Sequence, residues 1–331
     1  MRTPSLWLPA GLVVVWLGGC SRPERGLAPV PPQSASASAA PSAAPTPVAS
    51  ATAAPKGSPP RTLHFAWRPP GSDARAYAAT DPEDQHRIVL SRGVERGGRY
   101  PALIAFHGQP QPGQAPRDYA FARTVTSIVF ELVERGEVEP LVLIIPVFRF
   151  LGRNWPEFDL VAFEGELARV LGSERITLGA RWLFGHSGAA GCGGDGLNGA
   201  HRIHPAAVGF FDTCVGAGFG HEVRELARAR VPTLIMHSVE TAGFRPRPPT
   251  EYMTTFDFGQ VYGPLGLRPS EDCPGAPPDV PLRPQPYRCA SDAQGTTRAF
   301  VVDTGKGQEG HDAVVPVALR YFLRQFVNAP R

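Results

Sequence analysis

A serine surrounded by small residues is the feature of this sequence with the clearest chemical potential. Residues 182–191 read WLFGHSGAAG, in which Gly185 and Ala189 stand two places before and two places after Ser187. The apolar residues before the turn predict a buried strand, and the small residues allow the chain to turn sharply after it. A serine hydroxyl on such a turn can act as a nucleophile when a base removes its proton. In a chain rich in glycine and alanine this pattern also arises by chance, so the assignment depends on its context.

His311 is the strongest candidate for that base. It lies in the stretch GQEGHDAVV, which follows the last predicted strand. A neutral imidazole can accept the serine proton and return it to the leaving group. His186 lies inside the serine turn itself, and His64 and His86 lie in predicted edge strands, so these three are weaker candidates.

A metal site is not expected. His201, His204 and His221 lie close together in the sequence, but no HExxH pattern and no matched carboxylate accompany them. We therefore predict chemistry that needs no metal and no cofactor.

Short apolar runs alternate with helical patterns beyond residue 60. The runs PALIAFHG, PLVLIIPV, RWLFGHS, AAVGFFDTC, PTLIMHS and RAFVVDTG are continuous, as in strands buried on both faces of a parallel sheet. Apolar residues at helical spacing over 122–133 and 160–171 predict helices between them. Two earlier segments, RTLHFAWRP and HRIVLSRG, are typical of edge strands. The alternation predicts an α/β domain with a mostly parallel central sheet and helices on both faces.

The final helix is expected to begin near Pro316, because a proline in the first turn of a helix costs little. Its inner face would consist of Leu319, Phe322, Leu323 and Phe326. This boundary leaves His311 in a loop between the last strand and the last helix. That loop would lie at the sheet edge where Ser187 also lies.

Residues 242–296 interrupt the alternation before the last strand. They are rich in proline and glycine and contain several aromatic residues. An excursion of this length in a compact domain is usually functional, so we expect a cap-like insertion over a pocket. The alternative is a surface insertion without a role in the site.

Residues 61–331 resemble the α/β-hydrolase superfamily, nearest the esterase D, feruloyl-esterase and polyhydroxybutyrate-depolymerase-like branch. The resemblance rests on the HG pair that ends ERGGRYPALIAFHG, on the serine turn and on the terminal histidine segment. It implies an α/β-hydrolase fold and an oxyanion hole formed by the backbone N–H groups of Gln109 and Gly188. Ala189 departs from the glycine that is commoner at its position.

The resemblance also indicates where the third catalytic residue lies. In this fold the acid usually follows the seventh strand, here VPTLIMHSVET, which favours Glu240. Asp212, at the end of GFFDTC, would serve in a variant that places the acid after the previous strand. Asp303 is a poorer candidate, and Asp312 adjoins the histidine, whose neighbours rarely share its hydrogen-bonding direction. We expect Glu240, with Asp212 as the alternative.

The N-terminal 20 residues have the pattern of an export signal. A positive start precedes a short apolar run, and the segment ends in LGGC, which resembles the lipobox of bacterial lipoproteins. This implies acylation of Cys20 and a protein held on a bilayer in the bacterial cell envelope, with Ser21 favouring the outer membrane. Residues 21–60, rich in alanine, proline and serine, would form a disordered tether. An ordinary signal peptide or a short anchor with an incidental cysteine is the alternative.

The charge and the cysteines limit the remaining possibilities. A net charge of +3 is too small to indicate nucleic-acid binding. Setting Cys20 aside leaves four cysteines, an even number that predicts two disulfides in an exported chain. We favour Cys192 with Cys214 and Cys273 with Cys289, although the sequence leaves the other pairings open.

Together these features predict a membrane-anchored serine hydrolase that cleaves a carboxylic ester through an acyl-enzyme on Ser187. Its substrate would be an ester-bearing small molecule or polymer. A peptidase or amidase on the same fold, or a catalytically silent binding lipoprotein, would share much of this sequence. The acyl group, the alcohol and the oligomeric state are not indicated.

Overall fold

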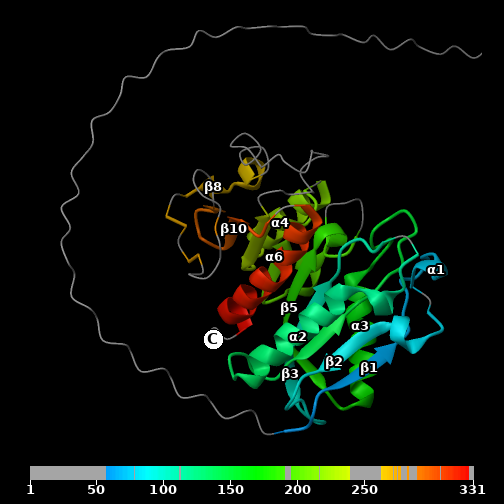
Figure 1. The fold of residues 1–331 in the computed structure, drawn as a ribbon. Coiled ribbons are helices and arrows are strands. Elements are labelled where there is room, and N and C mark those ends of the chain that lie inside the picture. The colour runs from blue at the N-terminus through cyan, green and yellow to red at the C-terminus, as the bar shows by residue number, and fades with distance from the viewer. Residues whose placement is uncertain are drawn as a thin grey trace, which may run out of the picture. The chain divides into compact units, whose positions relative to one another are not determined.

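The computed structural model (Figure 1) describes the domain that follows the predicted tether. The described residues are 57–77, 79–111, 113–190, 195–215, 217–238, 262–270, 272–273, 275–276, 282, 289–305 and 307–327. The predicted signal segment, Cys20 and the tether as far as residue 56 lie outside them.

One sheet organises the described residues. Its strands are β1 (Arg61–Phe65), β2 (His86–Leu90), β3 (Arg99–Phe106), β4 (Val142–Ile145), β5 (Thr177–His186), β6 (Ala207–Phe211), β7 (Thr233–Ser238), β8 (Arg268–Pro269), β9 (Cys289–Ser291) and β10 (Thr297–Val302). Their order across the sheet is β1-β2-β4-β3-β5-β6-β7-β10-β9-β8. The strands from β4 to β10 in this order pair in parallel, and the pairs at both edges are antiparallel. The predicted mostly parallel sheet is confirmed.

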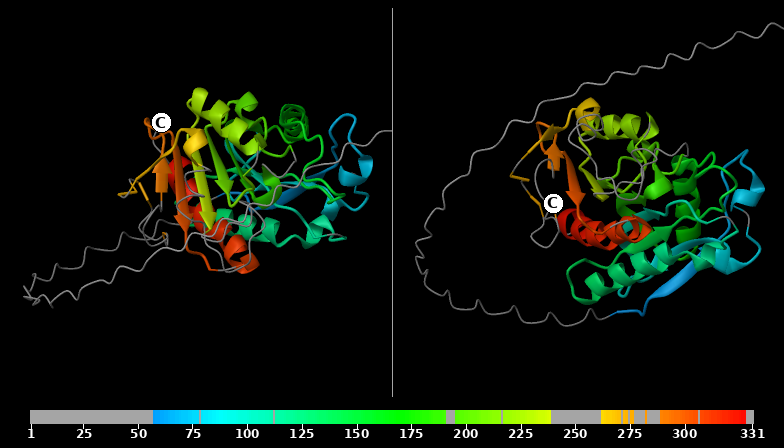
Figure 2. Two further views of the ribbon diagram at one scale, coloured as in Figure 1. Left: turned by 90° about the horizontal axis from the view of Figure 1, so that it is seen from above. Right: turned by 45° about the horizontal axis from the view of Figure 1, so that its top comes forward.

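Helices cover both faces of the sheet (Figure 2). The longer helices are α2 (Ala120–Glu134), α3 (Leu160–Ser173), α4 (Ala217–Arg228) and α6 (Gly307–Phe322), and α1 (Ala74–Tyr77) is a single turn. Apolar residues of α2 and α6 belong to one buried cluster, and those of α3 and α4 belong to a second cluster on the opposite face. Short 3₁₀ turns are η1 (Pro82–Asp84), η2 (Pro116–Asp118), η3 (Ser187–Ala189), η4 (Ala200–Ile203) and η5 (Gly263–Leu265), and η6 (Leu323–Val327) is a π-helical end to α6.

The start of the last helix was predicted wrongly. Helix α6 begins at Gly307 and passes through Pro316, which costs about 3 kcal/mol in a helix interior. Burial of His311, Val314 and Val315 on its inner face offsets that cost. His311 therefore lies on a helix that packs against the sheet, and not in a loop before it.

The described part of the insertion extends the sheet. Strands β8 and β9 lie within residues 242–296, and β9 pairs with β10. Cys273 and Cys289 form a disulfide, the pairing favoured from the sequence. Cys214 is also disulfide-bonded, and Cys192, its predicted partner, lies outside the described residues. Within the described residues, no helix has the length and apolar character needed to cross a membrane.

Candidate active site

Ser187 lies on a strained turn at the carboxyl end of β5. The last five residues of this strand are buried, and Ser187 follows them as the first residue of η3. Its φ of 53° is in the left-handed region, which costs a residue with a side chain on the order of 1–3 kcal/mol. The backbone N–H of Cys214 donates to the Ser187 carbonyl at 3.2 Å, so the turn is tied to the loop that follows β6.

Small residues at both ends of the turn are required by close packing. A β-carbon on Gly185 would lie 2.6 Å from the β-carbon of Ala189 and 2.6 Å from Cδ1 of Leu197. Ala189 is fully buried, and its carbonyl accepts a hydrogen bond from the Leu197 N–H at 2.9 Å. The spacing of Gly185, Ser187 and Ala189 thus follows from how closely the chain returns to the strand.

A buried carboxylate–imidazole pair stands beside this turn. Asp212 follows β6 directly, and its Oδ2 accepts a hydrogen bond from Nδ1 of His311 at 2.6 Å. The Ser238 hydroxyl, at the end of β7, donates to the same oxygen at 2.8 Å, and the Ser238 N–H donates to Oδ1 at 3.0 Å. The structure therefore brings His311 to Asp212, the alternative acid of the sequence analysis. Glu240, the first choice there, lies outside the described residues.

The electrostatic environment of the pair suits proton transfer. Burial alone would raise the pKa of Asp212 and lower that of His311, but the hydrogen bond and the opposite charges outweigh it. The pKa of Asp212 is lowered and the pKa of His311 is raised. His186 differs, because burial and the nearby charge of His311 lower its pKa to about 3. Among these two imidazoles, His311 is the one placed to exchange protons.

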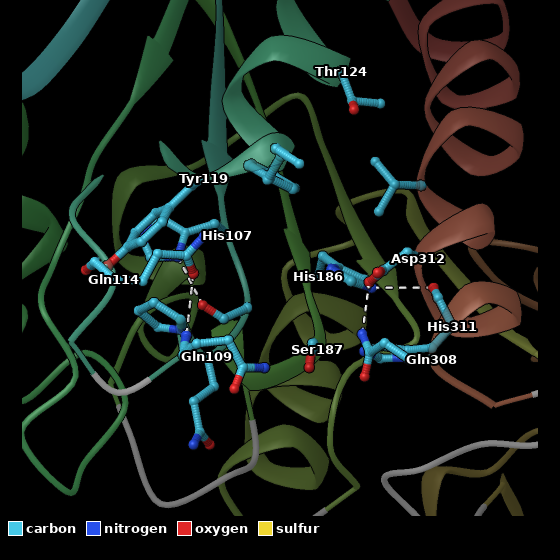
Figure 3. Close-up of a pocket in the computed structure, with 16 residues that line it drawn as sticks. His107, Gln109, Gln114, Tyr119, Thr124, His186, Ser187, Gln308, His311 and Asp312 are labelled. Carbon is cyan, nitrogen blue, oxygen red and sulfur yellow. Dashed lines mark hydrogen bonds between the residues drawn. The ribbon is translucent and has the colours of Figure 1, made fainter. Parts of the chain in front are cut away.

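A cavity of about 290 Å³ joins Ser187 and His311 (Figure 3). It is lined by His107, Gly108, Gln109, Pro110, Gln111, Gln114, Tyr119, Ala120, Phe121, Thr124, His186, Ser187, Gln308, His311, Asp312 and Val315. In Figure 3, Ser187 lies between Gln109 on one side and His311 on the other. None of the insertion's described residues lines this cavity. Among the described residues, no hydrogen bond joins Ser187 Oγ to His311. Hydrogen bonds between catalytic groups often shorten only when substrate binds.

The HG segment, residues 107–109, lies directly against the serine. A β-carbon on Gly108 would be 2.6 Å from Cβ and 3.1 Å from Oγ of Ser187. Gln109, whose N–H is one predicted oxyanion donor, lines the cavity. Gly188, the other, is buried next to Asn154, whose Nδ2 would lie 2.6 Å from a β-carbon on Gly188. Both predicted donors are thus on segments adjacent to Ser187.

The other histidines named in the sequence analysis lie elsewhere. His201 bonds through Nδ1 to the buried Glu222 at 3.0 Å, and Glu222 also accepts the backbone N–H groups of Gly199 and His201. The Glu222 carboxylate therefore holds η4 in place. Its hydrogen bond to His201 gives that imidazole a partner that is not a metal. His204 is exposed, and the rings of His201 and His221 are 6.3 Å apart.

One group of side chains among the described residues has the spacing of metal ligands. Ligand atoms of His186, His311 and Asp312 all lie within 4.8 Å of one another. A metal ion bound there would occupy a ring nitrogen of His311. Since Nδ1 is held by Asp212, only Nε2 would be left for it.

Two residues of the site carried no recognisable signal in the sequence. Ser238 is a serine at a strand end, and its role follows only from the proximity of β7 to β6. Trp155 belongs to no recognisable sequence pattern, yet its indole N–H donates to the His107 carbonyl at 3.1 Å. Such contacts depend on three-dimensional proximity and leave no spacing pattern.

The fold class is that of the α/β-hydrolases. The chain has a mostly parallel sheet, a positive-φ serine at the carboxyl end of a strand, and then an aspartate and a histidine in that order. The predicted fold class is confirmed.

No protein-family model and no curated protein matches the sequence. Solved structures similar to this chain include a ferulic acid esterase, 13% identical over 81% of this chain and 98% of that chain, with a TM-score of 0.44. A mutant of the feruloyl esterase module from Clostridium thermocellum, complexed with sinapinate, is 12% identical over 82% of this chain and 91% of the module, with a TM-score of 0.44. Brefeldin A esterase, a bacterial homologue of human hormone-sensitive lipase, is 11% identical over 85% of this chain and 78% of that chain, with a TM-score of 0.40.

Replacing Gly108 with alanine should disable the site without unfolding the protein. The new methyl group would overlap Cβ of Ser187 and displace the hydroxyl. We expect kcat/KM for an ester to fall by about 100-fold or more, since a displacement near 1 Å can cost that much. Steady-state kinetics and circular dichroism measure the two effects. Gly165→Ala, on an exposed and open position of α3, is the matched control and should leave activity unchanged.

Replacing Asp212 with asparagine keeps the shape and removes the charge. We expect kcat/KM to fall by about 10³- to 10⁴-fold, because the amide neither holds the imidazole in the required tautomer nor stabilises the imidazolium. The residual activity should persist to lower pH, since the carboxylate that raises the pKa of His311 is gone. A pH–rate profile measures both changes. Asp303→Asn, at an exposed carboxylate after β10, should behave like the wild type; equal losses in both variants would argue against the pair.

Proposed function

We propose that this chain is a serine hydrolase that cleaves a carboxylic ester through an acyl-enzyme on Ser187. The observation that supports it best is the buried Asp212–His311 pair at the cavity that contains Ser187. The acid in this proposal is Asp212, because it already occupies the Nδ1 side of His311. Nε2 is then the ring nitrogen left for the serine.

In the first half-reaction, Nε2 of His311 accepts the proton of Ser187 as Oγ attacks the ester carbonyl carbon. The imidazolium that forms is stabilised by the ionised Asp212. The tetrahedral intermediate then collapses, the bond to the alcohol oxygen breaks, and His311 returns the proton to that oxygen. A water molecule repeats the sequence on the acyl-enzyme, which releases the acid and the free Ser187.

The oxyanion of the intermediate would accept hydrogen bonds from the N–H groups of Gln109 and Gly188. Fixed donors of this kind contribute about 3–4 kcal/mol each to lowering the barrier. They act in a site whose neighbouring His107 and His186 are buried and neutral.

The cavity indicates a compact substrate group. Its volume of about 290 Å³ is near the lower end of the range for small-molecule sites. Four glutamine side chains line it, at positions 109, 111, 114 and 308, and they offer neutral donors and acceptors. Ester hydrolysis is less demanding for this site than amide hydrolysis, because an alcohol leaves more readily than an amine.

The labelling of Ser187 tests this function directly. A fluorophosphonate probe should label the wild-type protein, and short p-nitrophenyl esters should be hydrolysed. Ser187→Ala should abolish labelling and lower kcat by about 10⁶-fold, the scale of losing a nucleophile of this type. Mass spectrometry of the labelled peptide identifies the residue. Folded wild-type protein that neither reacts with the probe nor hydrolyses the esters would remove the proposal, and faster turnover of matched amides would change it to an amidase.

We also propose that acylated Cys20 anchors the protein to the bacterial envelope, with residues 21–60 as the tether. The LGGC segment motivates this, and several acyl chains would hold the domain stably on a bilayer. In the native host, wild-type protein should incorporate a palmitate analogue and fractionate with outer membranes. Cys20→Ser should lose both properties, and Ser21→Asp should keep the label but shift towards inner membranes. An unlabelled wild-type protein recovered in the soluble periplasm would contradict the anchor.

A further inference from the structure

The segment between β4 and α3 is unusually constrained next to the site. Trp155 and Glu157 have positive φ values of 45° and 58°. Backbone of this kind persists only where surrounding contacts fix it. Trp155 is fully buried, so its conformation is held by its packing. This segment, residues 154–157, is called the brace below.

One side of the brace contacts the HG segment. The Trp155 indole N–H donates to the His107 carbonyl at 3.1 Å. The indole ring also lies 4.8 Å from the His107 imidazole and 4.6 Å from Phe148, measured between ring centroids. The Phe148 ring is stacked on His107 at 5.0 Å with only 6° between the planes. The strand end is therefore fixed both by a hydrogen bond and by packed rings.

The next peptide of the HG segment is held in the same way. Nδ1 of His107 lies 2.7 Å from the Gly108 carbonyl, so Nδ1 carries the proton and donates. Burial lowers the pKa of His107 to about 3, which keeps this ring neutral. In a trans peptide the N–H points opposite to the C=O, so the N–H of Gln109 is directed away from the imidazole. Two consecutive carbonyls are thus fixed, and with them the directions of two N–H groups beside Ser187.

The other side of the brace contacts the chain around the serine turn. Asn154 is 3% exposed and packs against Gly188, the residue after the nucleophile. The Trp155 carbonyl accepts from the Asp195 N–H at 3.2 Å, and the Glu157 N–H donates to Asp195 Oδ2 at 2.7 Å. The same short segment therefore touches both segments that carry the proposed oxyanion donors.

We propose that Trp155 is a positioning residue for the oxyanion hole. It acts through the His107 carbonyl, and the brace fixes the Gln109 and Gly188 segments relative to each other before substrate binds. Trp155 does not line the cavity, so it exerts this effect without touching substrate. The inference rests on the proposed function, because it assigns a role within that reaction. Donors fixed in advance stabilise the transition state more than the bound ester, so loosening them should lower kcat and change KM little.

The test removes the indole N–H and keeps a ring. Trp155→Phe should lower kcat for a short p-nitrophenyl ester by about 10- to 100-fold, with KM nearly unchanged. Affinity for a trifluoromethyl ketone, which forms an oxyanion on Ser187, should fall by a similar factor. Trp67→Phe is the matched control, since the described ring contacts of Trp67 are with His86, Phe158 and Phe163 and not with His107. It should retain wild-type kinetics.

A second pair of variants tests the same idea if Trp155→Phe fails to fold. His107→Asn keeps an N–H donor near the position of Nδ1, and His107→Leu removes it. The asparagine variant should retain at least about 10-fold more kcat than the leucine variant, since only it can hold the Gly108 carbonyl. Equal kcat in Trp155→Phe and Trp67→Phe would overturn the positioning role of Trp155. Equal kcat in the two His107 variants would overturn the role of the His107 ring in directing the Gln109 N–H, on which that positioning role depends. An inactive wild-type protein would instead remove the proposed function itself.

Discussion

The buried hydrogen bond between Asp212 and His311 is the interaction on which the site depends. A carboxylate with no exposed surface is costly unless it is paired, and breaking such a pair typically costs about 3–5 kcal/mol. Here the pair joins the end of β6 to helix α6, and Ser238 adds the end of β7. The hydrogen bonds of Asp212 therefore fix the positions of the ends of β6 and β7 and of helix α6. The cavity lies beside them.

Three residues in or next to the site have strained backbone. Ser187, Asp212 and Trp155 all have positive φ, and none of them is a glycine. Each costs free energy that the burial of a large two-sided core can offset. In return the hydroxyl, the carboxylate and the indole N–H are presented in directions that a regular strand or helix would not allow. The rigid sheet makes these strained positions stable.

The sequence predicts this arrangement unevenly, for physical reasons. Continuous apolar runs identify buried parallel strands, and small residues around Ser187 identify a sharp turn, because both patterns are local. The start of α6 was misjudged, since tertiary packing carries the helix through Pro316. The choice between Glu240 and Asp212 stayed open because either could follow a strand at the same sheet edge. Ser238 and Trp155 act only through contacts between distant segments, which a single sequence does not encode as spacing.

Proximity to Asp212 also explains why one histidine among several is suited to be the base. His107, His186, His237 and His311 are all buried, and all but His237 line the cavity. Burial lowers the pKa of His107 and His186 to about 3 and that of His237 to about 4, so these rings stay neutral. Only His311 among these four has its Nδ1 on the carboxylate, and only its pKa is raised. A base must hold a proton during the reaction and release it afterwards, which needs a pKa near the working pH. The Asp212 carboxylate thus makes His311 the histidine that is suited to act as the base. The neutral histidines can pack and donate hydrogen bonds without competing for the proton.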